Sequence, residues 1–178
     1  MEEYTREAFP NAKIARMDSD TTTSKESHNQ ILEKVKNNEI DILIGTQMIA
    51  KGLDFENVTL VGIIAGDTTL NLPDFRSPER TFQLITQVAG RAGRGKYQGS
   101  VVLQTYNPEH YSIIEARDQN YEKFYNSEIV LRKEFLYPPY VNIISILIYG
   151  PNRTRVGKLT KEIYNILVKE IYRIYGKK

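Results

Sequence analysis

Residues 87 to 95 read QVAGRAGRG, in which Arg91 and Arg94 stand three positions apart among three glycines. Arginine side chains make planar, bidentate contacts, and their usual partners are carboxylates and phosphates. Glycine costs about 1 kcal/mol relative to alanine inside a helix. So many glycines at a helix end therefore indicate that the backbone comes close to a ligand. The stretch predicts an anion site, with a phosphate as the candidate ligand.

A second polar stretch, GTQMIAKGLDF at residues 45 to 55, follows the apolar run DILI. If that run is a strand, Gly45 and Thr46 lie at its carboxyl end, where ligands bind in open α/β sheets. Thr46 offers a hydroxyl, Lys51 offers charge and Asp54 offers an acceptor for a ribose hydroxyl. This is the chemistry of a phosphate-and-sugar loop, although glycine-rich turns also follow strands for purely structural reasons.

Three familiar nucleotide motifs do not fit the sequence. Residues 90 to 96 have the P-loop spacing, but Tyr97 stands where a Ser or Thr hydroxyl must bind magnesium, and a helical pattern precedes it. Asp67 ends an apolar run as a Walker B acid would, yet no P-loop accompanies it. The glycines of the arginine stretch follow a helical pattern in the order G-x-x-G-x-G, which is not the dinucleotide fingerprint.

Both polar stretches need a scaffold, and the apolar periodicity predicts an α/β one. Strands are predicted at residues 13 to 17, 41 to 45, 58 to 66 and 100 to 106. Helices are predicted from Ser24, a candidate N-cap, to Asn37, and from Pro78 into the arginine stretch. Such alternation predicts a mostly parallel sheet, and the runs 41 to 45 and 58 to 66 are typical of strands buried on both faces.

The pattern changes after Asn107. Residues 109 to 135 predict one or two polar helices, and Pro138 with Pro139 marks a boundary. Residues 141 to 150 predict a strand, and a long amphipathic helix with a basic face follows. Because one strand and one helix cannot form a core of their own, they either pack on the first domain or belong to an incomplete second one.

Composition excludes several classes of protein. The chain has no cysteine and only two histidines, so we expect no disulfide and no metal site. No apolar run approaches the roughly 20 residues that span a bilayer, and the first ten residues are not a signal peptide. The sequence therefore predicts a soluble, cytoplasmic protein with no membrane partner.

Taken together, the two stretches resemble motifs V and VI of superfamily 2 helicases in their order, in their spacing of about 40 residues and in the strand between them. The segments RMDSDTT, PDFRSPERTFQLITQVAGRAGRG, VVLQTYNPEH and YPPY extend the resemblance to the replication-restart helicases, the primosomal protein N′ family. The resemblance covers most of residues 10 to 140. It implies a RecA-like second helicase lobe at residues 1 to 107, a helical extension at 108 to 137 and the start of a truncated C-terminal α+β domain at 138 to 178.

The resemblance also implies roles for individual residues. Arg91 and Arg94 would reach the γ-phosphate of ATP across the cleft between two lobes, with Gln87 helping to position it. The other implied ATP contacts are Gly52, Asp54, Gly90 and Gly93. The implied contacts to single-stranded DNA are Gly45, Thr46, Gln47 and Lys51. ATP and magnesium would be held mainly by a first lobe that this sequence lacks, and zinc by a cysteine-rich module of the family rather than by this chain.

For the whole protein, the resemblance implies an ATP-dependent DNA helicase of the bacterial cytoplasm. Its implied partners are single-stranded and forked DNA, primosome proteins and single-strand-binding protein. We expect this chain alone to be an inactive fragment, with Met1 a possible cloning start. Two alternatives stay open. One is a lobe of an RNA helicase or another superfamily 2 translocase, which would not be expected to share PDFRSPER. The other is a non-catalytic module that binds an anion or nucleic acid.

Two groups of charged residues have a structural alternative. Asp18 and Asp20 could simply cap the helix that follows them. In PDFRSPER, an internal ion-pair cluster is at least as good an interpretation as contact with DNA; its members would be Asp74, Arg76, Glu79 and Arg80.

Overall fold

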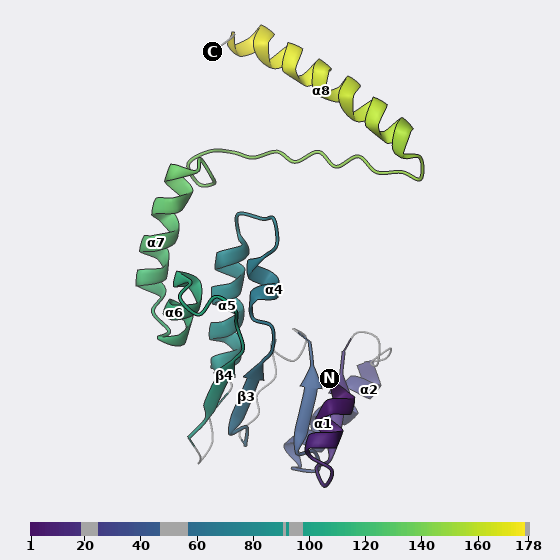
Figure 1. Ribbon diagram of the computed structural model, residues 1–178, viewed down its shortest axis with the longest axis vertical. Helices are drawn as coiled ribbons and strands as arrows, with labels where there is room; N and C mark the ends of the chain where they lie inside the picture. Colours follow the sequence, from purple (N-terminus) through teal and green to yellow (C-terminus); the bar gives the residue numbers. More distant parts are fainter. Residues whose placement is uncertain (19–24, 47–56, 91, 93–97, 177–178) are drawn as a thin grey trace. The chain divides into compact units, whose positions relative to one another are not determined.

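The computed structural model describes residues 1 to 18, 25 to 46, 57 to 90, 92 and 98 to 176. The chain divides into two compact units, Met1–Tyr137 and Pro138–Lys178. This division falls at the proline pair that the sequence marked as a boundary. Figure 1 shows the elements of each unit.

The first pair of strands comes from the N-terminal part of the chain. β1 (Ile14–Met17) and β2 (Ile42–Gly45) run parallel, with Ile14 opposite Ile42 and Met17 opposite Gly45. The helix α2 (Lys25–Lys36) connects them, and α1 (Glu2–Ala8) precedes β1. The predicted strands at 13 to 17 and 41 to 45 are confirmed, as is the helix between them; its proposed cap, Ser24, lies outside the described residues.

The second pair is also parallel and is joined by a helical crossover. β3 (Leu60–Ile63) pairs with β4 (Ser100–Leu103), so that Ile63 lies opposite Leu103. Between them come a single turn, α4 (Asp67–Leu70), and a longer helix, α5 (Ser77–Ala89). After β4 follow α6 (Tyr111–Arg117) and α7 (Tyr121–Glu134). The predicted α/β class with parallel strands is confirmed, although the described strands form two separate pairs.

The core of the first unit lies around α5, which is placed between α4 and the α6–α7 pair (Figure 1). Pro78 in the first turn fits the helix start because that turn needs no backbone donor there. The apolar stripe of α5 supplies Phe82 and Ile85, which pack with Ile113, Ala116 and Phe124 from α6 and α7. The rings of Phe82 and Phe124 stack with their centroids 4.2 Å apart. Ile63 and Leu103 of the strands pack against this cluster.

One expectation about burial was wrong. The run 58 to 66 was expected to be covered on both faces, but Leu60 is 64% exposed and Val102, on the neighbouring strand, is 60% exposed. Ile63 and Leu103, which pack against the core cluster, are half-buried, whereas Leu60 and Val102 lie on the opposite face. Among the described residues, the face of this strand pair that carries Leu60 and Val102 is open to solvent.

The second unit contains one regular element among its described residues. Residues 141 to 150 were predicted to form a strand, and this is wrong, because no described strand pairs with them. Their apolar side chains stay exposed, Ile144 at 86% and Leu147 at 82%. The predicted long helix is confirmed as α8 (Arg153–Tyr175), which Asn152 caps by accepting a hydrogen bond from the Arg155 N–H at 3.0 Å. No residue of α8 is buried.

Candidate nucleotide and nucleic-acid site

The end of α5 leads into the glycine-arginine stretch. Gln87 lies on the exposed side of the last turn, and Gly90 follows as the C-cap residue, its N–H donating to the Thr86 carbonyl at 3.0 Å. Arg91, Gly93 and Arg94 lie outside the described residues. The structure therefore describes the chain up to Gly90, the residue just before the predicted arginine contacts.

The geometry of the helix end does not require a glycine at position 90. Its φ angle is −65°, which any L-residue adopts. A Cβ atom added there would meet the Thr86 and Gln87 carbonyl oxygens at 3.4 and 3.7 Å, ordinary contact distances within the same helix. An alanine could therefore occupy this position of the fold, so helix geometry alone does not explain the glycine.

The predicted DNA contacts begin at the end of β2. Gly45 is the last residue of that strand and Thr46 is the first after it, and both are exposed. Their position at the carboxyl end of a parallel strand agrees with the position that the sequence predicts for a ligand loop. The remaining predicted contacts of this loop lie outside the described residues; they are Gln47, Lys51, Gly52 and Asp54. Their roles stay predictions.

The charged residues of PDFRSPER pair within the protein. The Asp74 carboxylate accepts hydrogen bonds from Arg76 Nε and Nη2, each at 3.0 Å, and lies 3.1 Å from Arg80 Nη1. These bonds, led by those from the Arg76 side chain, lower the pKa of Asp74 to about 2. The structure thus supports the internal ion-pair interpretation for this cluster.

Glu79 joins a second network that the sequence did not reveal. Arg132 on α7 contacts Glu79 Oε2 at 2.7 Å and Glu128 Oε1 at 2.8 Å. Tyr111 donates its hydroxyl to the buried Glu128 carboxylate, and burial followed by that hydrogen bond raises the pKa of Tyr111. The Arg132 guanidinium also lies over the Phe75 ring, 5.3 Å from its centroid. The network ties the first turn of α5 to α6 and α7, and Tyr111, Glu128 and Arg132 line a cavity of about 270 Å³.

Asp67 has a structural role rather than a metal-binding one. Its side chain is buried and accepts hydrogen bonds from Thr105 Oγ1 and the Tyr106 N–H, both at 2.7 Å, and from Asn107 Nδ2 at 3.3 Å. The backbone N–H of Tyr106 is the largest cause that lowers the pKa of Asp67. No sequence signal pointed to these contacts, because the donors lie about 40 residues further along the chain.

Gly66, beside Asp67, packs so closely against Leu103 that a side chain there would displace the leucine. A Cβ atom there would lie 2.6 Å from Leu103 Cδ1, closer than any real contact. The Gly66 N–H also donates to the Gln104 carbonyl at 3.0 Å. The segments that follow β3 and β4 are therefore held tightly together.

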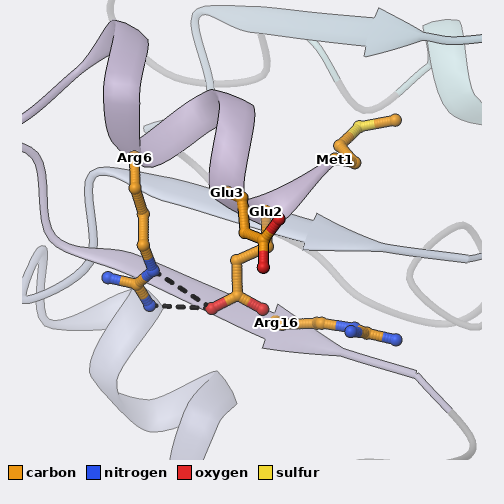
Figure 2. Close-up of a pocket in the computed structure, with 5 residues that line it drawn as sticks. All are labelled: Met1, Glu2, Glu3, Arg6 and Arg16. Atoms are coloured by element: carbon orange, nitrogen blue, oxygen red, sulfur yellow. Dashed lines mark hydrogen bonds and ion pairs between the residues drawn. The ribbon is translucent and has the colours of Figure 1, made fainter.

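A cavity near the N-terminus does not belong to the predicted site. Figure 2 shows its lining residues, Met1, Glu2, Glu3, Arg6 and Arg16, around a space of about 320 Å³. Arg6 pairs with Glu2 at 2.8 Å along α1, and Arg16 Nε donates to Asp18 at 2.6 Å. Asp18 therefore has an ion-pair partner, whereas Asp20 lies outside the described residues.

The described part of the chain offers neither a metal centre nor a membrane-spanning helix. It holds no group of three or more His, Asp or Glu side chains arranged to bind a metal ion. None of its helices is both long enough and apolar enough to cross a bilayer.

Residues 1 to 96 match the family model "Helicase conserved C-terminal domain". This chain belongs to that helicase family, which confirms the class that the two polar stretches predicted. Among curated proteins it is similar to replication restart protein PriA of Bacillus subtilis, with 51% identity over 94% of this chain and 21% of the relative. PriA of Synechocystis is 44% identical over 87% of this chain and 19% of the relative.

The chain thus spans about a fifth of the length of these curated relatives. The similarity confirms the resemblance to replication-restart helicases. The chain also aligns with a solved structure of Dbp5 from S. cerevisiae, with a TM-score of 0.43 and 16% identity over 90% of this chain and 34% of that chain. That likeness is too distant to add to the argument.

Proposed function

We propose that this chain is the second motor lobe of an ATP-dependent DNA helicase that acts in replication restart and primosome assembly. The observation that carries the proposal is the family match over residues 1 to 96, which includes both polar stretches, together with 51% identity to a replication restart protein. The exposed positions of Gln87 at the end of α5 and of Thr46 after β2 support it. Its partners would be single-stranded and forked DNA, primosome proteins and single-strand-binding protein.

In this proposal, ATP and magnesium are held mainly by the first lobe, and this chain completes the site. Arg91 and Arg94 stabilise negative charge on the γ-phosphate, and Gln87 helps to position it. Gly52, Asp54, Gly90 and Gly93 would line the nucleotide. The absence of a geometric need for glycine at Gly90 fits this role, because a side chain there would obstruct an approaching ligand rather than the fold.

The second half of the proposal concerns DNA. The exposed hydroxyl of Thr46, the backbone around Gly45, and the Gln47 and Lys51 side chains would hold phosphates of one strand. Phosphate contacts fix a nucleic acid in place without reading its sequence, as a translocating motor requires. Because both polar stretches belong to one lobe, closure of the two lobes on ATP would move this grip along the strand.

Substitution of Arg94 tests the arginine role in the protein that carries both lobes. We expect Arg94→Ala to leave nucleotide affinity nearly unchanged, since the first lobe supplies most of the binding, and to lower kcat for ATP hydrolysis by at least ~10²-fold. Arg94→Lys should restore little, because one ammonium group cannot reproduce the guanidinium fork. Steady-state phosphate release with saturating single-stranded DNA is the measurement.

The matched variant is Thr46→Ala, which should weaken DNA binding and uncouple hydrolysis from it. The 178-residue chain alone serves as the negative control, with no turnover expected. Normal hydrolysis together with lost DNA affinity in Arg94→Ala would place the arginine stretch in the DNA groove and overturn the proposed role.

A further inference from the structure

Tyr106 is exposed to an unusual degree for a side chain in an ordered loop. Its exposed fraction is 88%, the highest among the large apolar and aromatic side chains described in the first unit. An aromatic ring in water gains by being covered. Such a ring on a fixed support is therefore a candidate contact for a ligand.

The backbone that carries the ring is held by hydrogen bonds on both sides. The buried Asp67 carboxylate accepts the Tyr106 backbone N–H at 2.7 Å and the Thr105 hydroxyl at 2.7 Å. Thr105 Oγ1 in turn accepts the Asn107 N–H at 3.0 Å. Because the backbone on both sides of Tyr106 is held, the loop itself needs little ordering on binding, which favours affinity.

The loop lies where the carboxyl ends of two parallel strands meet. It follows β4, and Asp67 follows β3, the strand paired with it. This edge is the usual ligand position in open α/β sheets. Ala65, just before Gly66, has a φ angle of +54°, a left-handed conformation that costs a non-glycine residue energy and recurs at functional sites.

The surrounding chemistry selects the kind of ligand. Residues 104 to 107 read QTYN and carry no cation, while Asp67 beneath them carries a negative charge. A phosphate is therefore disfavoured at this point. The buried core of a protein interface is built from several apolar or aromatic anchors, whereas the residues beside the ring, at positions 104, 105 and 107, are polar. A flat, uncharged, polar-edged group fits best, and nucleobases have these properties.

We propose that Tyr106 is a stacking platform for a base of single-stranded DNA, held in place by the Asp67 carboxylate. The inference rests on the proposed function insofar as that function supplies the strand. It adds a base contact to a grip that otherwise consists of phosphate contacts. Stacking on an aromatic ring is tolerant of sequence because every base has a π-face.

The test is single-stranded DNA affinity of the full-length protein, measured with oligothymidylate by fluorescence anisotropy. Tyr106→Ala should weaken binding by about 5- to 150-fold, the range for loss of one stacked base, and Tyr106→Phe should bind nearly as wild type. The matched control is Tyr4→Ala. Tyr4 is 76% exposed but lies on α1 rather than in this loop, so the variant should bind DNA as wild type does. Because the Tyr106 side chain is so exposed, its removal leaves the Asp67 hydrogen bonds in place.

Two further experiments distinguish a DNA base from the adenine of ATP as the group that stacks on Tyr106. An oligonucleotide of abasic sites should bind wild type and Tyr106→Ala equally, and ATP affinity should be the same in both. Oligonucleotides carrying 5-iodouracil should crosslink to a peptide containing Tyr106. Equal oligothymidylate affinity in wild type and Tyr106→Ala, or loss of ATP affinity alone, would overturn the inference while leaving the helicase proposal intact. Failure of the wild-type protein to bind single-stranded DNA at all would overturn both.

Discussion

At the scale of single residues, two acidic side chains stay ionised for different reasons. Asp67 is surrounded by neutral donors, whereas Asp74 is paired with the cations of Arg76 and Arg80. Salt weakens ion pairs at the protein surface, but it has little effect on buried hydrogen bonds to neutral groups. The Asp67 contacts should therefore be less sensitive to salt than the Asp74 cluster.

Asp67→Asn tests the role of the buried carboxylate in stability. The folded state lowers the pKa of Asp67 below its usual value of 3.8. Its contribution to stability is therefore fully present above about pH 4 and is lost as the pH falls through the folded-state pKa. An asparagine side chain cannot accept the same bonds with both of its terminal atoms, so the variant should be less stable than wild type at pH 7, and the difference should narrow as the pH falls below about 4.

Urea midpoints at pH 7 and pH 3 measure this difference. Asp41→Asn is the control, because Asp41 is exposed and accepts one hydrogen bond, from the Lys13 N–H. If the difference in urea midpoint between wild type and Asp67→Asn is the same at both pH values, the ionised carboxylate does not have the role proposed for it.

At the scale of elements, helix ends use residues other than glycine in left-handed conformations. Gln119 after α6 has a φ angle of +51°, and Leu136 after α7 has one of +54°. Each is followed by a backbone N–H that reaches back to close the helix, Asn120 to Glu115 and Tyr137 to Arg132, both at 2.8 Å. Glycine is the usual residue at such positions because it adopts positive φ without strain.

Gln119→Gly should therefore stabilise the first unit. Relief of left-handed strain gains roughly 1–2 kcal/mol, and the greater freedom of glycine in the unfolded chain offsets part of it, so we expect a net gain of about 0.5–1 kcal/mol. The neighbouring Asp118→Gly is the matched control: Asp118 is also exposed but has a φ angle of −83°, so its replacement should destabilise. Opposite shifts of the denaturation midpoint in the two variants support left-handed strain at Gln119, and equal shifts refute it.

Sequence periodicity predicted those elements that have a local cause. Strands of four residues at 14 to 17 and 42 to 45 and the stripe of α5 follow from apolar spacing alone. Residues 141 to 150 show the limit of prediction from periodicity. Their sequence favours a strand, but a strand also needs a partner strand to pair with. The same distinction applies to the candidate site. The motifs indicated Gly45, Thr46, Gln87 and Gly90, whose roles stay predictions. The support of Tyr106 depends on a contact between distant segments and carried no local signal.

At the scale of the whole molecule, the two units differ in how they are stabilised. The first has a buried cluster built from α5, α6 and α7. The second has an extended segment without a described strand partner and a helix without a buried residue. Most helical stability in proteins comes from packing of an apolar face, so α8 has little of that support within its own unit.

Native-state hydrogen exchange should reveal this difference. In the 178-residue chain, we expect amides of residues 141 to 175 to exchange faster than those of β2 and β3, because they open with a smaller free energy. Peptide-level mass spectrometry at pH 7 is the measurement, with α5 as the internal reference for protected helix. Protection of residues 141 to 175 as strong as that of the two strands would show that the second unit is stabilised by contacts beyond those described.

The close approach of Gly66 to Leu103 has an evolutionary consequence. Since a Cβ atom at position 66 would lie 2.6 Å from Leu103 Cδ1, a larger residue at 66 requires the Leu103 side chain to shift, so the cost of changing position 66 depends on the residue at position 103. The order in which substitutions arise then matters, because a change at position 66 costs less after position 103 has become smaller. Variation at two positions 37 residues apart in sequence is thereby coupled, at the base of the loop that carries Tyr106.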